Sequence, residues 1–299
     1  MSVVPSLKVL TSHLVVALVA LVVVGGATRV MEAGLACPDW PLCYGVLLPG
    51  RQMNMRVFLE WFHRLDAFFV GMALLALLLI SLWRRHQLPP WLPWMSLLAT
   101  ALVAIQGGLG ALTVTHLLAP SMVTAHLATA LLLVTLVSAL DQGLAGSAPR
   151  AQPAWWLPLA LLPTALVLAQ CVLGGLMASQ WAVDHCFSSG SQCEWVARHR
   201  QLAMPAALSV MALAGCTLLT PAADPLLRGL TTIASVLVGV QVSLGLLTLH
   251  SQLQLPLLTV THQLLAALLV ALLGAVVGRL LVSVRQPSPP VALEVPRGQ

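Results

Sequence analysis

Eight long apolar stretches are the feature of this sequence that most constrains its fold. They cover residues 12–31, 57–82, 91–113, 119–140, 155–178, 197–219, 229–249 and 257–282. About 20 consecutive apolar residues are enough for an α-helix to cross the hydrocarbon core of a bilayer. Only 8% of the residues are charged, whereas a soluble domain usually carries about 25%. The sequence therefore predicts an all-α integral membrane protein with eight transmembrane helices.

The positions of the basic residues predict the orientation of these helices. Most of them lie on one side of the predicted membrane: Lys8, Arg84, Arg85, Arg150, Arg228, Arg285 and Arg297. Because loops rich in Lys and Arg stay in the cytoplasm, we expect both termini to be cytoplasmic. The net charge of +5 does not indicate nucleic-acid binding, since the basic residues cluster at helix ends.

The first apolar stretch has one alternative interpretation, a cleaved signal peptide. Lys8 precedes this stretch and Gly25-Gly26 follows it, as in a secretory signal. Cleavage would leave seven helices and would break the repeat described next. We therefore expect the stretch to remain as the first helix.

The second half of the sequence repeats the plan of the first half. Gly25-Gly26 and Gly174-Gly175 end corresponding helices, and Gln106 to Gly110 matches Gln241 to Gly245. Four helices per repeat keep both repeats in one orientation, so we expect two tandem four-helix bundles in a parallel pseudo-two-fold repeat. The predicted parts are an N-terminal bundle (1–141), a cytoplasmic linker (142–153), a C-terminal bundle (154–283) and a disordered cytoplasmic tail (284–299).

Four histidines recur with this repeat. His63 is followed by His126, and His199 by His262, each time after 63 residues. The even number of helices per repeat places all four at one depth, two in each bundle. Two imidazoles that face each other across a bundle suit the axial positions of a haem iron. A lone membrane histidine is more often a packing residue, but the duplicated spacing favours two haem sites.

Two arginines directly follow histidines of this set. Arg64 follows His63, and Arg200 follows His199. A guanidinium near the aqueous boundary can bind a haem propionate with two hydrogen bonds, so we expect both arginines to contact haem. Zinc is less suited, since it usually takes four close ligands. The sequence lacks Cys-x-x-Cys-His, so covalent haem attachment is not indicated.

One acidic residue distinguishes the two predicted sites. Glu60 precedes His63 by three residues and shares its helix face, whereas Val196 occupies the matching position before His199. A carboxylate beside only one haem suggests chemistry at the N-terminal site, as a proton carrier or a stabiliser of developing positive charge. The alternative is that Glu60 caps its helix, where an acid favours the positive end of the dipole.

Two cysteine pairs lie in the long loops on the side opposite the basic residues. Cys37 and Cys43 precede the second predicted helix, and Cys186 and Cys193 precede the sixth. Four cysteines allow three pairings, and the repeat favours one disulfide within each loop. A structural role and an exchange of electrons with an external thiol protein are both open for the first pair.

At these residues the chain resembles the haem A synthase family. The resemblance covers roughly residues 10–283. It is carried by Gly25-Gly26 with Arg29, the loop Gly34 to Cys43 with Cys-Pro-Asp-Trp-Pro-Leu-Cys, Glu60-x-x-His63-Arg64, His126, His199 and His262. Members of this family oxidise a methyl group of haem O to a formyl group, which gives haem A for terminal oxidases.

The resemblance implies roles for the residues above. His63 and His126 would hold the substrate haem O, with Glu60 as the catalytic carboxylate, and His199 and His262 would hold a haem b cofactor. It also implies a bacterial inner membrane, with haem O synthase and an electron-transfer or thiol-redox protein as partners. A homo-oligomer is one alternative for the oligomeric state. The second half departs from the Glu-x-x-His pattern, and the second cysteine pair is a variable feature of the family.

Two other functions are open on the sequence alone. A non-enzymatic di-haem electron carrier also needs two bis-histidine sites, but its haems would be stacked through the bilayer instead of lying at one depth. A haem transporter or chaperone accounts for the histidines but not for the one-sided Glu60. Only the enzyme would make a haem that carries an aldehyde.

Overall fold

The computed structural model describes residues 3–145, 150–177 and 194–284, and within them the regular structure is helical. The helices are α1 (Val3–Val30), α2 (Met55–Trp83), α3 (Leu92–Thr115), α4 (Pro120–Gly143), α5 (Trp156–Met177), α7 (Glu194–Leu219), α8 (Pro225–His250) and α9 (Pro256–Ser283). In these ranges eight helices are long and apolar enough to cross a membrane. The prediction of an all-α multi-pass membrane protein is confirmed. Most of the predicted tail lies outside the described residues.

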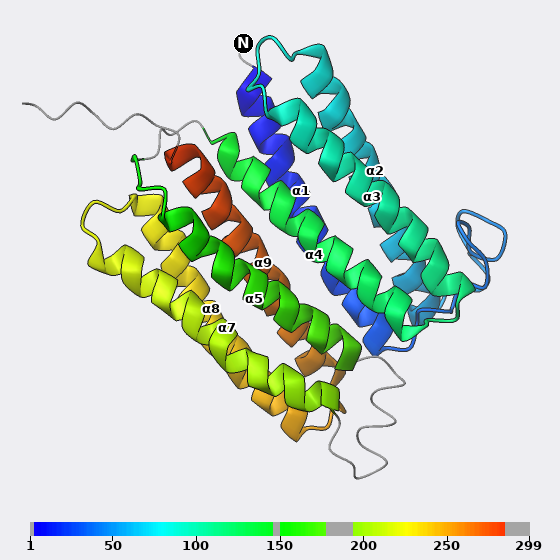
Figure 1. Cartoon of the computed structure of the whole chain (residues 1–299). Coiled ribbons are helices and arrows are strands. Elements are labelled where there is room, and N and C mark those ends of the chain that lie inside the picture. Colours follow the sequence, from blue (N-terminus) through cyan, green and yellow to red (C-terminus); the bar gives the residue numbers. More distant parts are fainter. Residues whose placement is uncertain (1–2, 146–149, 178–193, 285–299) are drawn as a thin grey trace, which may run out of the picture.

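The helices group into two sets of four neighbours (Figure 1). In the first bundle, α1, α2, α3 and α4 pack in a closed circuit; in the second bundle, α5, α7, α8 and α9 do the same. The bundles meet along α1, α4, α5 and α9, and the most extensive contact of all is that of α4 with α9. The pseudo-two-fold relation between the bundles and the exact domain boundaries stay predictions.

Glycines let α4 and α9 approach closely. Gly274 and Gly278 lie one turn apart on α9. A Cβ atom added to them would lie 2.6 Å from the backbone oxygen of Thr135 and 2.4 Å from that of Ala139, both in α4. Because lipid and side chains are equally apolar, close packing of small residues is a main source of helix association in membranes. These glycines therefore fix the contact between the two bundles.

The first helix begins well before the predicted residue 12, at Val3. Its early turns contain Lys8, whose ammonium group pairs with Asp141 near the end of α4. The hydroxyls of Thr11 and Ser12 also donate to Asp141, at 3.0 and 2.8 Å. The apolar pattern missed these turns because their charge is neutralised by a partner far away in the sequence.

Candidate functional site

The four predicted histidines lie within the first three turns of α2, α4, α7 and α9. The imidazole rings of His63 and His126 approach each other inside the first bundle, with centroids 6.4 Å apart and planes at 75°. His199 and His262 are close enough in the second bundle to interact electrostatically. The structure thus brings together both pairs that the sequence predicted. Their role as iron ligands stays a prediction.

Each imidazole packs against a glycine of the helix that precedes its own. The pairs are His63 with Gly25, His126 with Gly110, His199 with Gly174 and His262 with Gly245. A Cβ atom at these glycines would lie 2.8, 3.6, 3.0 and 3.1 Å from the Cε1 atom of the ring. At three of the four positions even alanine would therefore press on the ring. Sequence reasoning used some of these glycines as markers of the repeat but missed their contact with the histidines.

The four Nδ1 atoms share one environment. All four are buried, and none has a partner within normal hydrogen-bond geometry. Each ring nevertheless lies beside the backbone carbonyl of a residue one turn before its glycine: Leu21, Gln106, Gln170 or Gln241. A histidine that ligates a metal usually turns its other ring nitrogen towards such an acceptor. The Nε2 atoms are then the ones that could hold a metal.

The distance between the rings of His63 and His126 suits one metal atom between them. Two metal–imidazole bonds of about 2 Å each would separate the ring centroids by about 6 Å. Among the described residues, no group of three or more His, Cys, Asp or Glu side chains could hold a metal ion. A haem needs only two ligands from the protein, because the porphyrin supplies the other four. The histidine pairs therefore fit a haem better than a bare ion.

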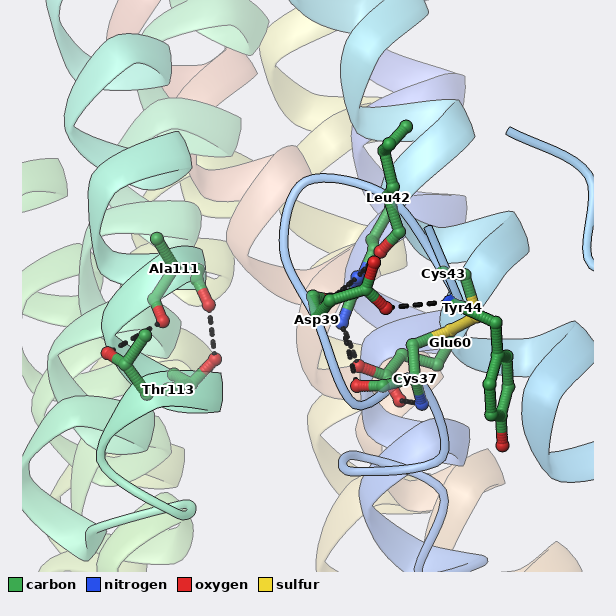
Figure 2. Close-up of polar contacts among 11 residues, drawn as sticks. Cys37, Asp39, Leu42, Cys43, Tyr44, Glu60, Ala111 and Thr113 are labelled. Atoms are coloured by element: carbon green, nitrogen blue, oxygen red, sulfur yellow. Dashed lines mark hydrogen bonds and ion pairs between the residues drawn. A yellow bond between two sulfur atoms is a disulfide. The ribbon is translucent and has the colours of Figure 1, made fainter. Parts of the chain in front are cut away.

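Glu60 is buried next to the first pair, with 4% of its surface exposed. Its Oε2 atom accepts a hydrogen bond from the backbone N–H of Cys37 at 2.8 Å, and its Oε1 atom pairs with Arg64. Figure 2 shows Glu60 beside Cys37 and the loop. A buried carboxylate is costly unless it is paired and hydrogen-bonded, and here both conditions are met.

The alternative role of Glu60 as a helix cap is wrong. Helix α2 begins at Met55, and the side chain of Asn54 accepts hydrogen bonds from the backbone N–H groups of Arg56 and Val57. These bonds satisfy donors that the helix itself leaves without partners. Glu60 lies further along the helix and contacts the preceding loop instead.

Arg64 holds the loop before α2 against the helix. Its guanidinium donates to the carbonyls of Asp39 and Leu42 at 2.5 Å each and to that of Cys37 at 3.5 Å. Together with the pair to Glu60, these contacts give Arg64 a role that the sequence did not predict. Its contact with a haem propionate stays a prediction.

The loop itself is closed by a disulfide. Cys37 and Cys43 are bonded, as predicted, and both are buried. Asp39 accepts hydrogen bonds from the backbone N–H groups of Gly45 and Tyr44 at 2.7 and 2.6 Å (Figure 2). These bonds, that of Gly45 above all, hold the pKa of Asp39 below its usual value despite the opposing effect of desolvation. The loop is thus built around Asp39 as well as the disulfide.

The second bundle differs at the matching places. Glu194 is exposed and pairs with Arg198 at 2.5 Å on the surface of α7. Arg200 is exposed and lines a shallow pocket of about 360 Å³ with Ala197 and Gln201. Its predicted contact with haem stays a prediction, and the predicted Cys186–Cys193 pair lies outside the described residues.

Comparison with known proteins places the chain in a family. Residues 8–274 match the family described as cytochrome oxidase assembly protein. The haem A synthase of Sphingopyxis alaskensis is 30% identical, over 89% of this chain and 90% of that protein; that of Rhizorhabdus wittichii is 27% identical, over 85% and 88%. The haem A synthase of Shewanella oneidensis is 30% identical over 55% of this chain, which spans about half (54%) of that relative. The chain belongs to the family of cytochrome oxidase assembly proteins, and it is similar to these haem A synthases.

Proposed function

We propose that the protein is a haem A synthase, which oxidises a methyl group of haem O to a formyl group by successive hydroxylations. The observation that carries the proposal is Glu60, a buried carboxylate one turn from His63. Only one of the two histidine pairs has such a group among the described residues. The family of the chain and the names of its relatives support the same reaction.

The first bundle is the proposed substrate site. His63 and His126 would bind haem O through its iron, and their separation supports this role. Arg64 would face the propionates from the edge of the site while it holds the loop. This arrangement would fix the porphyrin so that one methyl group lies near Glu60. The protein then contributes orientation and electrostatics, as is usual for reactions of haem.

The proposed role of Glu60 is proton transfer. Each hydroxylation would add the oxygen of one water molecule to the methyl carbon and release two protons and two electrons, which would pass to the electron-transfer partner. Two such steps give a geminal diol, which loses one water molecule to leave the aldehyde. A carboxylate within reach can take a proton from one hydroxyl during this loss, and it can also stabilise positive charge that develops on the carbon. The hydrogen bond from Cys37 and the pair with Arg64 hold the carboxylate in one position for both roles.

The second bundle is the proposed cofactor site. His199 and His262 would hold a haem b, which supplies one-electron transfer when bound. In the described part of this bundle no carboxylate corresponds to Glu60, since Glu194 is exposed and pairs with Arg198. We place both termini in the cytoplasm of a bacterial inner membrane, with the disulfide loop on the outer side. Haem O synthase would supply the substrate, and an electron-transfer or thiol-redox protein would act at the outer side.

Haem extraction and mass analysis test this function. Cells that make haem O would be compared with and without the protein, and with Glu60→Gln. We expect haem A, or its hydroxylated precursor, only with the unaltered protein, and retained haem b in Glu60→Gln. The matched control is Glu194→Gln, which removes an exposed glutamate with the same spacing to its arginine.

Two results would contradict the proposal. Full haem A formation by Glu60→Gln would show that Glu60 is not catalytic. Unchanged haem O beside bound haem b, in folded protein with redox partners supplied, would favour the electron carrier or the haem transporter.

A further inference from the structure

A short sequence recurs in the helices that contact the histidines. Gln-x-x-Leu-Gly occurs at residues 106–110 in α3, 170–174 in α5 and 241–245 in α8. Its last residue is the glycine that packs against an imidazole. In α1 the place of the glutamine, one turn before Gly25, is taken by Leu21. Three histidines thus have a glutamine beside them, and His63 has a leucine.

In the first bundle the glutamine ties two helices together. The Nε2 atom of Gln106 in α3 donates a hydrogen bond to the backbone carbonyl of His126 in α4, at 2.8 Å. This carbonyl belongs to the residue whose imidazole faces His63. The backbone that carries His126 is therefore fixed to the neighbouring helix.

In the second bundle the two glutamines make different contacts. The Nε2 atom of Gln170 donates to the backbone carbonyl of His199 at 2.8 Å and lies 3.3 Å from the ring Nε2 atom. The Nε2 atom of Gln241 lies 3.4 Å from the ring Nε2 atom of His262. The two ring contacts would compete with iron, because an Nε2 atom that binds a metal has no lone pair left for an amide donor. The bond to the backbone carbonyl of His199 does not compete and would persist.

Leu21 cannot form such a bond. Its side chain is partly buried against the apolar core. Within the described ranges, no side chain donates a hydrogen bond to the ring or the backbone carbonyl of His63. Gly25 and the backbone carbonyl of Leu21 position this ring, and these are contacts that all four histidines have in equivalent form. His63 is thus the only one of the four histidines without a glutamine, in the part of the chain that the structure describes.

We propose that Leu21 makes His63 the releasable ligand of the substrate site. This inference rests on the proposed function, in which the first site must admit haem O and release haem A at every turnover, whereas the second keeps its haem. Gln106 and Gln170 fasten the backbones of His126 and His199 to a neighbouring helix, and Gln241 lies against the ring of His262. Leu21 leaves the fourth free to move away, so that one side of the substrate site opens while His126 stays in place.

The rate of haem loss tests the inference without any turnover. The protein would be loaded with ferric haem B, and transfer to an excess of haem-free globin would be followed by absorbance. We expect haem loss to have a fast phase from the first bundle and a slow phase from the second. His262→Ala should abolish the slow phase and so assign it to the second bundle. Leu21→Gln should slow the fast phase by about 3- to 10-fold, the effect of one hydrogen bond between membrane helices.

Matched variants separate the hydrogen bond from side-chain size. Leu21→Met has the length of glutamine but no donor, and should keep the fast phase unchanged. Gln170→Met should speed the slow phase by a similar factor. Equal rates for Leu21→Gln and Leu21→Met would overturn the inference. If Leu21→Gln does not assemble, Gln106→Met is measured instead. This variant should speed the fast phase of haem loss, and an unchanged rate would also overturn the inference.

The test also distinguishes this inference from the proposed function. If the protein showed the expected rates of haem loss but never made haem A, the proposed function would be refuted and the difference between the two sites would stand. If the protein made haem A, but its Leu21→Gln variant lost haem as fast as Leu21→Met, the proposed function would stand and the proposed role of Leu21 would be refuted.

Discussion

Gly26 of α1 lies directly against the side chain of Gln263 in α9. A Cβ atom at Gly26 would lie 1.7 Å from the Oε1 atom of Gln263, which is the residue after His262. The preceding residue, Gly25, packs against His63 of its own bundle. The glycine pair therefore contacts His63 of one candidate site and the residue next to His262 of the other. Two adjacent positions without side chains are what allow α1 to lie between them.

The first prediction is that Gly26→Ala disturbs the second site from a helix of the first bundle. The added methyl group must displace the end of the Gln263 side chain, and Gln263 directly follows His262 in α9. We expect a shifted absorbance or paramagnetic-resonance spectrum of the haem bound by His199 and His262. Gly107→Ala is the control, because no atom lies within 4 Å of its added Cβ. Identical spectra for the two variants would show that the bundles are independent at this point.

Apolar length alone was enough to predict the eight helices, and histidine spacing was enough to predict which imidazoles meet. Both signals depend on regular geometry within or between helices. The start of α1 was missed because Lys8 is neutralised by Asp141, which is far away in the sequence. The partners of Glu60 were missed for the same reason, since the N–H group of Cys37 reaches it only through the folded loop.

Another signal was present in the sequence but was used only in part. The match of residues 106–110 with 241–245 indicates the repeat, and the same pattern also occurs at 170–174. Its meaning depends on the neighbouring helix, where the glutamine meets a histidine. A sequence shows that a pattern recurs; the packing of helices shows what the pattern contacts.

The second prediction concerns the contact between the bundles. Gly278→Ala places a methyl group 2.4 Å from the backbone oxygen of Ala139, and backbone cannot rotate away as a side chain can. Such overpacking typically costs about 1–3 kcal/mol. We expect a lower thermal unfolding midpoint in detergent. Gly239→Ala in α8, whose added Cβ has no atom within 4 Å, should leave the midpoint unchanged or raise it slightly. A midpoint equally unaffected in both variants would contradict close α4–α9 packing.

The third prediction is a pH dependence of the disulfide loop. The pKa of Asp39 is lowered in the folded loop from its ordinary value of 3.8. A lowered folded pKa means that the ionised carboxylate stabilises the loop, fully above about pH 4, and that this contribution is lost as the pH falls through the folded pKa. Hydrogen exchange at Tyr44 and Gly45, corrected for its intrinsic pH dependence, should therefore be constant from pH 5 to 8 and faster in stronger acid.

Asp39→Asn provides the control for this pH dependence. The amide side chain keeps the shape but has no charge to lose, so the acid-induced increase in exchange should disappear. One of the bonds to Tyr44 and Gly45 would also be lost, because they use different carboxylate oxygens and an amide nitrogen cannot accept. The other would be weaker, because an ionised acceptor is the stronger one. Exchange in the variant should therefore be faster than in the parent at neutral pH. The same acid response in both proteins would assign it to another group.

The last prediction separates the two roles of Arg64. Lysine keeps the charge, but its single ammonium nitrogen cannot replace both Nη1, which donates to the carbonyls of Asp39 and Leu42, and Nη2, which pairs with Glu60. Hydrogen bonds to charged groups contribute about 1.5–3 kcal/mol each, so Arg64→Lys should raise hydrogen exchange in residues 37–43 by at least about 10-fold. Haem A formation should fall with it, because the N–H group of Cys37 that orients Glu60 moves with the loop.

The control for Arg64→Lys is Arg198→Lys, which changes an exposed arginine with the same spacing to its glutamate. Exposed pairs contribute about 0–1 kcal/mol, so this variant should behave as the parent in both measurements. Haem retained in the second bundle by Arg64→Lys would confirm that the bundle stays folded. If haem A formation fell while exchange in the loop stayed at the parent rate, Arg64 would act on the haem propionate and not through the loop.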